Sequence, residues 1–549
     1  MPPTIAVTLP GGRVEEVPFG TSVAEVLGEG PGGPPVAAVL NGEPVNLGTL
    51  LTEPARVAPI LLSDRTGFAI YARSVCYLLA LAVYELFPGR KLVVEHSINT
   101  EVFATLDGGR HVTTDEVARL LAHMRDLVAT DAPIERLRVP REQALRTFAD
   151  QGMTDKTSLL QSVNQPYVSV YRCRGYHDYL FGTLVPSLGR LRTFDVQAFA
   201  GGILVLLPDK KNLDRIPPRS EIPKLRATFR ETERWAHILG AQNVGGLNEK
   251  LSVDEGRDLI LVAEGLHEKK ISQIADAILI DIDRTKLVLI AGPSSSGKTT
   301  FSKRLSIQLR VLGLEPFPIA ADDYFLPHAL TPRDADGNYD FESLAALDVA
   351  ALSADLTTLL AGGEIELVRF DFVAGTRVRT GRTYRMNDRS VLIVEGIHGL
   401  NDAMTPDIPP EAKYRVYCSS LTPLNMDDHT AIFVSDVRTL RRIIRDARTR
   451  GKSAEGTLTM WPSVRAGEEK HIFPYQEHAD VMFNSSLLYE INALQPHVQP
   501  LLEAIDHDSP VYVEASRLLK LLRFFRPASE RYIPANSIIR EFIGGSCFD

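Results

Sequence analysis

The segment Gly292-Pro-Ser-Ser-Ser-Gly297-Lys298-Thr299 has the residue types and the spacing of a loop that binds phosphate groups. Glycines let the backbone wrap around an anion and point its N–H groups at it. In such a loop the lysine bridges the β- and γ-phosphates of a nucleotide, and the threonine hydroxyl completes the coordination of Mg²⁺. The segment predicts an ATP site with Mg²⁺, formed by Gly292, Ser294, Ser295, Ser296, Gly297, Lys298, Thr299 and Thr300.

Carboxylates follow two apolar, strand-like segments further along the chain. Asp322 and Asp323 come directly after residues 316–321, and Glu395 ends residues 391–395. In doubly wound folds, the carboxyl ends of the strands border the active crevice. One carboxylate of the aspartate pair could accept the proton of an attacking hydroxyl group, and Glu395 could serve either Mg²⁺ or the acceptor. The alternative for the aspartate pair is a solvated loop.

Six arginines crowd one predicted helix: Arg438, Arg441, Arg442, Arg445, Arg448 and Arg450. Such density is typical of a solvated basic helix. It is also typical of a lid that clamps the phosphates during transfer, and no other supply of arginine lies nearby in this part of the sequence.

Short apolar segments must position these groups. Residues 286–291 predict a strand that leads into the glycine loop, and residues 300–310 predict the helix that leaves it. Further strands are predicted at residues 316–321, 391–395 and 414–418. The C-terminal part, residues 279–549, is therefore predicted to be an α/β domain with a doubly wound parallel sheet.

Length and composition bound the class of protein. A chain of 549 residues predicts two to four domains. Its net charge of -9 argues against broad attraction to nucleic acid and favours a small-molecule enzyme. The four cysteines show no pairing pattern and the N-terminus lacks signal-peptide features, so we expect a cytoplasmic protein. The most apolar window, residues 75–87, contains Glu85 and is shorter than the roughly 20 residues that cross a bilayer, so no span is expected.

Residues 1–63 predict a β-grasp domain. Strands are expected at residues 4–9 and 13–17 around a tight turn, followed by a capped helix from Val23 and a strand at residues 36–40. The segments TLPGGRVEEVPFGTSVAEVL and AAVLNGEPVNL resemble the TGS domain of threonyl-tRNA synthetases and some GTPases. The resemblance implies a small docking module.

Residues 64–225 predict an α+β domain, which resembles the second additional, editing-type domain of threonyl- and alanyl-tRNA synthetases. That family holds zinc with an HxxxH pair and a CxxxH pair. Here Arg73 and Tyr77 stand where the first pair belongs, whereas Cys173 and His177 keep the second. Because zinc sites take three or four protein ligands, we expect neither zinc nor editing.

Two further features concern the N-terminal half. The nearly balanced charges of residues 64–225 permit RNA binding without indicating it. Residues 226–278 show helical spacing of apolar residues with few breakers and predict a helical connector.

The region from about 286 to 505 resembles the uridine kinase and phosphoribulokinase family, through GPSSSGKTT, ADDYF, NYDFESLAALD, VRFDFVAGTR, VLIVEGIHGL, RRIIRDARTRGK and HADVMFNSS. With the N-terminal modules and the tail IPANSIIREFIGGS, the whole chain resembles bacterial uridine kinase-like nucleoside kinases with a TGS domain. The resemblance implies transfer of the γ-phosphate of MgATP to the 5′-hydroxyl of a nucleoside of the uridine or cytidine type. We also expect the protein to form a homo-oligomer.

Roles for individual residues also come from this resemblance. It makes Asp322 the general base and Asp340 a ligand of the ribose hydroxyls, with Thr299 and Glu395 at the Mg²⁺. The remaining residues that it implies are Lys298, Arg442, Arg445 and Arg450 for catalysis, and Tyr339, Phe370 and Arg377 for binding of the acceptor.

The chain departs from the family at the place where pyrimidine kinases grip the base with a tyrosine and a histidine. Phe370 and Gly375 stand there instead. A pocket without these polar groups rejects other acceptors less well, so the base stays open. The alternatives are a kinase of another sugar or sugar-phosphate alcohol, and an RNA-binding regulatory ATPase that uses the synthetase-like domains.

Overall fold

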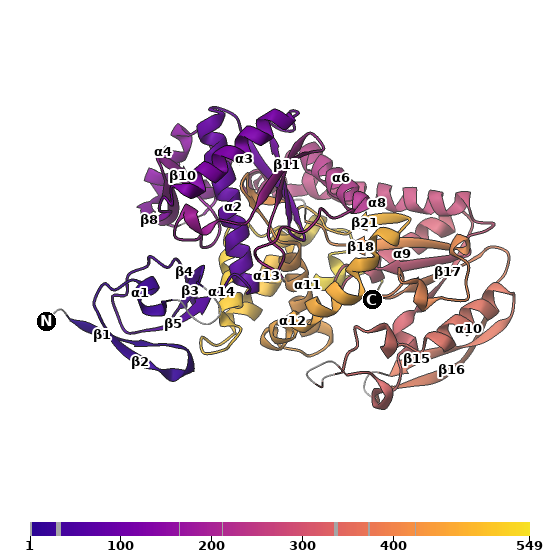
Figure 1. Cartoon of the computed structure of the whole chain (residues 1–549). Coiled ribbons are helices and arrows are strands. Elements are labelled where there is room, and N and C mark those ends of the chain that lie inside the picture. Colours follow the sequence, from indigo (N-terminus) through magenta and orange to yellow (C-terminus); the bar gives the residue numbers. More distant parts are fainter. Residues whose placement is uncertain are drawn as a thin grey trace.

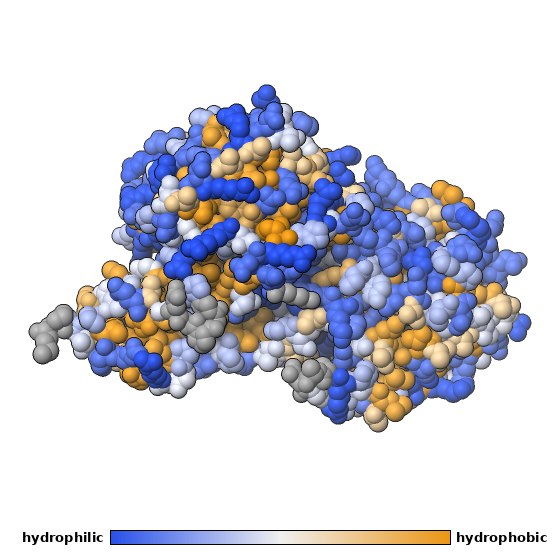
Figure 2. Space-filling model, in the orientation of Figure 1, coloured by the Kyte–Doolittle hydropathy of each residue, from blue (hydrophilic) through white to orange (hydrophobic). Residues whose placement is uncertain are grey.

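The computed structural model describes residues 3–28, 34–163, 165–210, 212–333, 337, 339–371, 374–422 and 424–548. Figure 1 shows three bodies: an N-terminal sheet at one side, a mixed domain beside it, and a C-terminal half that extends to the opposite end. The face in Figure 2 is mainly hydrophilic, with apolar side chains gathered over the N-terminal sheet and over the β15–β16 end.

The N-terminal body is a five-stranded sheet with one short helix. Its strand order is β2-β1-β5-β3-β4, with β1 parallel to β5. The predicted strands and helix are confirmed, and a capping box between Ser22 and Glu25 starts the helix. The elements are β1 (Thr4–Thr8), β2 (Val14–Pro18), α1 (Val23–Leu27), β3 (Ala37–Leu40), β4 (Glu43–Val45) and β5 (Ala55–Ile60).

The second body packs helices on two antiparallel sheets, β11-β12-β7-β6 and β10-β9-β8. Its elements are α2 (Arg65–Leu86), β6 (Leu92–Ile98), β7 (Glu101–Leu106), α3 (Thr114–Ala129), β8 (Glu135–Pro140), α4 (Arg141–Asp150), α5 (Thr154–Gln161), β9 (Tyr167–Cys173), β10 (Tyr176–Asp178), β11 (Asp195–Phe199) and β12 (Gly202–Leu206).

Helix α2 is the one helix among the described residues that is long and apolar enough, by length and composition, to cross a membrane. The helix has 22 residues because it begins at Arg65, so the expectation of a segment too short to span was wrong about its length. Of its most apolar window, 78% is buried inside the protein, where it packs as the central helix of this body.

The C-terminal body is built on a parallel sheet of order β14-β17-β13-β18-β21, which confirms the predicted doubly wound fold. Every residue of its central strand β13 is buried. The strands are β13 (Leu287–Ala291), β14 (Glu315–Ala320), β15 (Glu364–Asp371), β16 (Thr376–Arg385), β17 (Ser390–Glu395), β18 (Lys413–Ser419), β19 (Asn425–Asp427), β20 (Thr430–Ala431) and β21 (Val481–Asn484).

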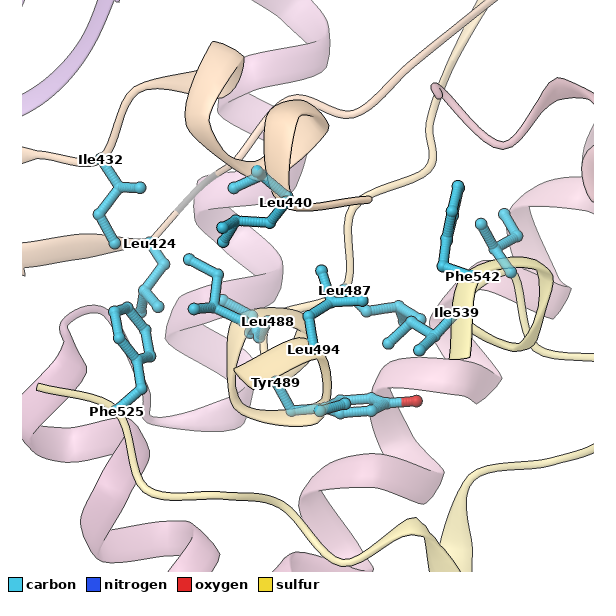
Figure 3. Packing of buried hydrophobic residues seen from close by; sticks show 14 of the residues in the cluster. Leu424, Ile432, Leu440, Leu487, Leu488, Tyr489, Leu494, Phe525, Ile539 and Phe542 are labelled. Carbon is cyan, nitrogen blue, oxygen red and sulfur yellow. The ribbon is translucent and has the colours of Figure 1, made fainter. Parts of the chain in front are cut away.

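Helices cover this sheet and extend its core. They are α9 (Lys298–Val311), α10 (Val349–Leu360), α11 (Val434–Thr449), α12 (Ala454–His471), α13 (Glu490–Glu503), α14 (Tyr512–Leu522) and α15 (Arg540–Ile543). Figure 3 shows Leu440, Leu494 and Phe542 in one apolar cluster, although they come from α11, α13 and the C-terminal tail. The tail is therefore part of the core.

Residues 226–278 lie in α6 (Pro223–Leu239), α7 (Val244–Ser252) and α8 (Arg257–Ile280). These helices pack inside the same large cluster as the parallel sheet: Leu247, Ile260 and Ile271 are fully buried in it. The segment that we expected to connect two domains is thus also one wall of the C-terminal core.

Buried charges join the second body to the C-terminal one. Nζ of Lys156 lies 2.7 Å from Asp178 and 2.9 Å from Asp427, and none of the three side chains is exposed. His429 Nδ1 lies 2.8 Å from Asp178 Oδ2. Asp427 and His429 belong to the β19–β20 hairpin, which stands between β18 and α11.

Replacing Lys156 with methionine should destabilise the protein strongly. The change leaves the buried carboxylates of Asp178 and Asp427 without the lysine charge between them, which costs about 3 to 5 kcal/mol. The matched control is Arg172→Met, because Arg172 and its partner Glu135 are 46% and 45% exposed, and the loss of this pair should cost below about 1 kcal/mol. Urea unfolding followed by tryptophan fluorescence measures both, and equal losses would contradict the assignment.

Candidate active site

The glycine loop has no room for a side chain at either of its two glycines. A Cβ on Gly292 would lie 1.9 Å from the carbonyl oxygen of Cys418, and one on Gly297 would lie 2.6 Å from Cγ2 of Ile538. Gly297 and Ser295 both have positive φ, 81° and 58°. The loop is therefore closely packed on both sides, between β18 and the C-terminal tail.

Helix α11 holds the loop through its carbonyl oxygens. Nε of Arg438 donates to Ser294 O at 3.1 Å, and Nη1 of Arg441 donates to Ser295 O at 3.3 Å. Both guanidinium groups are at most 1% exposed and form ion pairs, Arg438 with Glu468 and Arg441 with Glu490. The arginine-rich segment is thus not a solvated basic helix. Sequence reasoning gave these two arginines no separate role.

Three arginines with predicted catalytic roles meet beside the loop. Arg442 donates to Ser294 Oγ at 2.7 Å. Arg445 and Arg450 each place a nitrogen 3.5 Å from Oδ1 of Asp446, and Nε of Arg442 reaches the other oxygen of that carboxylate at 3.3 Å. Burial, with Arg450 close by, lowers the pKa of Arg445 to about 10. The structure therefore concentrates positive charge next to the phosphate loop.

Carboxylates face this charge across the loop. Thr299 Oγ1 donates to Glu395 Oε1 at 2.9 Å, and Nζ of Lys298 lies 3.2 Å from Pro293 O. The Asp322 side chain is exposed, yet the protein atoms around its carboxyl raise its pKa by desolvation, an effect that the positive charge of Lys298 opposes. Burial also raises the pKa of Glu395, against the same lysine and the Thr299 hydrogen bond.

The oxygens of Thr299 and Glu395 fit Mg²⁺, which is usually held by one or two protein oxygens together with substrate phosphates and water. The described residues contain no group of three or more His, Cys, Asp or Glu side chains arranged for a metal ion. A metal at this site would thus depend on phosphate oxygens for the rest of its coordination.

An aromatic cluster lies next to the carboxylates, on the side where β14 and β15 end. The ring of His328 stacks on Tyr339 with centroids 5.6 Å apart and lies 5.7 Å from Phe341 and 6.2 Å from Phe370. A Cβ on Gly375 would come within 2.4 Å of His328 Nδ1, so this glycine makes room for the histidine. His328 was missed in the sequence, because it precedes the other members of the cluster in a separate loop.

The remaining predicted acceptor residues have protein partners. Asp340 Oδ2 lies 3.9 Å from His471 Nε2. Arg377 donates to Asp348 at 2.8 Å, so its charge is already paired. Asp323 accepts the Phe370 N–H at 3.1 Å, which fixes that strand rather than the acceptor. Asn338, which precedes Tyr339 in the NYD motif, lies outside the described residues.

Glu342 is a further member of the site that the sequence reasoning did not single out. Burial, and then the charge of Glu468, raise its pKa to about 7, while Arg442 and Lys298 act in the opposite direction. Its Oε2 has no hydrogen-bond partner among the described residues. The signal was its place in NYDFES, two residues after Asp340.

The pair Cys173 and His177 does not form half of a metal site. In the β9–β10 hairpin Cys173 is opposite Tyr176, and His177 is opposite Arg172. Because residues opposite each other share a face and neighbours alternate, the thiol and the imidazole lie on opposite faces. Burial raises the pKa of the Cys173 thiol to about 11, which disfavours the thiolate that zinc needs.

Comparison with known proteins agrees with both halves of this description. Residues 287–491 match the model of the phosphoribulokinase / uridine kinase family, so this part of the chain is similar to the kinases of that family. The N-terminal region is similar to threonine–tRNA ligases. It is 30% identical to that of Symbiobacterium thermophilum over 220 residues, which cover 39% of this chain and 34% of the relative.

Another threonine–tRNA ligase, from Desulforamulus reducens, is 31% identical over 216 residues, 39% of this chain and 34% of the relative. The chain thus spans about a third of the length of these curated relatives. Solved structures that are similar include a possible uridine kinase from Bacillus stearothermophilus, at 20% identity and a TM-score of 0.27, covering 39% of this chain and 100% of that chain. D-glycerate 3-kinase from Cryptococcus neoformans has 15% identity and a TM-score of 0.24, covering 38% and 87%.

Arg441→Met and Arg450→Met should differ strongly in their effect on stability. The first leaves Glu490 buried without its partner and should cost about 3 to 5 kcal/mol of stability. The second removes an ion pair in which the arginine is 56% exposed, so stability should change by below about 1 kcal/mol. Thermal unfolding of both variants measures this, and a stable Arg441 variant would show that the fold does not depend on the Arg441–Glu490 pair.

Proposed function

We propose that this protein is an ATP-dependent nucleoside kinase, which transfers the γ-phosphate of MgATP to the 5′-hydroxyl of a nucleoside. The observation that carries the proposal is the convergence of Lys298, Asp322 and the Asp446-linked arginines on one phosphate loop. Phosphoryl transfer requires little covalent chemistry from a protein. It requires positioning and electrostatic stabilisation, which such a set of groups can supply.

Each group has a chemical task in this proposal. The loop from Gly292 to Thr300 holds the phosphates. Thr299 with Glu395 would hold Mg²⁺, and a bound Mg²⁺ would neutralise part of the negative charge on the phosphates. Asp322 accepts the proton of the acceptor hydroxyl, and a carboxyl with a raised pKa is the stronger base for that step. Arg442, Arg445 and Arg450 stabilise the negative charge as it moves.

The acceptor site supports an alcohol that carries a flat ring. Rings of His328, Tyr339 and Phe370 form a cluster that a nucleobase could stack against. Asp340 would bind the ribose hydroxyls beside it. Arg377 is paired with Asp348, which leaves its guanidinium less suited to bind the phosphate of a phosphorylated sugar.

Asp322→Asn should abolish nucleoside-dependent ATP consumption. Loss of a general base lowers turnover by about 10² to 10⁴. The assay is ATP consumption with Mg²⁺ and a panel of ribonucleosides, deoxyribonucleosides and sugar phosphates. The matched control is Asp323→Asn, whose carboxyl holds a backbone N–H and should affect turnover far less. Turnover that survives in the Asp322 variant would refute the assigned base.

The pH profile tests the same carboxyl in a different way. Asp322 must be deprotonated to accept a proton, so kcat/KM should fall as the pH is lowered through its raised pKa. The charge of Arg450 lowers that pKa, so Arg450→Met should move the acidic limb to higher pH. An unchanged limb would mean that another group, such as Glu342, controls it.

The similarity of the N-terminal region to threonine–tRNA ligases supports a second candidate function, binding of RNA by residues 1–225. If the candidate is correct, tRNA should bind the full chain with an affinity that falls linearly, on logarithmic scales, with salt concentration. A filter-binding titration at several salt concentrations measures this. ATP consumption that occurs with RNA and with no nucleoside would promote this function over the kinase.

A further inference from the structure

The tail helix α15 places a carboxylate on the nucleotide-binding loop. Oε2 of Glu541 accepts the backbone N–H of Thr300 at 3.2 Å and its Oγ1–H at 2.7 Å. Thr300 is the third residue of α9, and N–H groups in the first turn of a helix have no acceptor within the helix. Glu541 supplies that acceptor from 241 residues away.

These donors are the ones that a bound nucleotide would use. In a loop of this type, the N–H groups at the start of the following helix bind the α- and β-phosphates. A carboxylate oxygen that accepts the Thr300 N–H thus stands where a phosphate oxygen belongs. Two anions cannot share one donor pair, so the Glu541 side chain must leave when a nucleotide enters.

The tail itself is firmly attached. Ile538 packs against Gly297, Phe542 is fully buried, and Nη1 of Arg448 donates to Phe542 O at 2.5 Å. On its other side Arg540 pairs with Glu530 at 2.7 Å. Figure 3 shows Ile539 and Phe542 among the core residues. The backbone around Glu541 is therefore fixed, and only its side chain has freedom to move.

An alternative partner for this carboxylate lies nearby. The negative charge of Glu541 acts on the guanidinium of Arg445, whose pKa burial otherwise lowers. Nε and Nη2 of Arg445 have no hydrogen-bond partner among the described residues, although Nη2 lies 3.5 Å from Asp446. A buried donor without an acceptor is costly, and a carboxylate turned towards it would remove that cost.

We propose that Glu541 competes with the α-phosphate of the nucleotide: it caps α9 in the empty site and turns to Arg445 when the nucleotide binds. The C-terminal tail then belongs to the nucleotide site and lowers the affinity of the site for the nucleotide. This inference rests on nucleotide binding at the glycine loop, the first element of the proposed function, and does not depend on the acceptor.

The direct test is nucleotide binding to the full chain with Mg²⁺ and without an acceptor. Glu541→Gln keeps the size of the side chain and removes its charge, so Kd should fall roughly tenfold, the equivalent of one charge-assisted hydrogen bond. The Kd values of ADP and ATP should fall by the same factor, because both nucleotides carry an α-phosphate. The matched control is Glu530→Gln, a tail carboxylate that does not touch the loop, and its Kd should not change.

A second comparison tests the movement of the side chain. Arg445→Met should weaken nucleotide binding more in the wild-type background than in Glu541→Gln, because only the charged carboxylate needs the arginine as its new partner. If Arg445→Met weakens nucleotide binding equally in both backgrounds, the Glu541 side chain does not move to Arg445. A Kd for Glu541→Gln that is unchanged or higher would overturn the competition itself.

The two proposals fail in different ways. If the wild type and both glutamine variants bind no nucleotide, the proposed function fails and this inference fails with it. If the wild type binds nucleotide tightly and consumes ATP with a nucleoside, but Glu541→Gln brings no gain, only the inference is lost. Thermal unfolding of each variant shows that the compared proteins are folded.

Discussion

The structure depends on the direction in which the glycine loop points its backbone. To aim N–H groups at an anion, the loop must turn carbonyl oxygens the other way, into the protein. Ser294 O and Ser295 O receive guanidinium donors from Arg438 and Arg441. Burying a guanidinium is costly unless a carboxylate accompanies it, which explains why α12 supplies Glu468 and α13 supplies Glu490. The positions of three helices follow from one loop.

The parts of this arrangement that are local in the chain could be predicted from the sequence. An apolar strand, two glycines and a helix occur within 25 residues, and each has its own pattern, so the loop and the parallel sheet were expected correctly. Glu468 and Glu541 could not be expected. Their carboxylates accept backbone N–H groups of the loop from 174 and 241 residues away along the chain. Nothing in the local sequence around a glutamate indicates such a distant partner.

The expected domain boundaries do not coincide with the packing of the cores, for a similar reason. Helical spacing correctly indicated helices in residues 226–278, but spacing does not show what a helix packs against, and Ile260 and Ile271 belong to the core beneath the parallel sheet. The buried group of Lys156, Asp178 and Asp427 joins the synthetase-like body to the hairpin that leads into α11. The N-terminal part is thus in direct contact with the segment that carries the loop-binding arginines.

The aromatic cluster of the proposed acceptor site shows how a comparison along the chain can mislead about a site. Phe370 and Gly375 stand where related kinases have polar groups, which suggests that this segment has lost its hydrogen-bonding capacity. In the folded protein the missing side chain of Gly375 is the space that His328 fills, with a ring nitrogen at the place where a Cβ would collide. A polar ring is therefore present in the cluster, supplied by another loop. The loss of a residue at one position and the loss of its chemistry in the cluster are separate events, because several segments build the cluster.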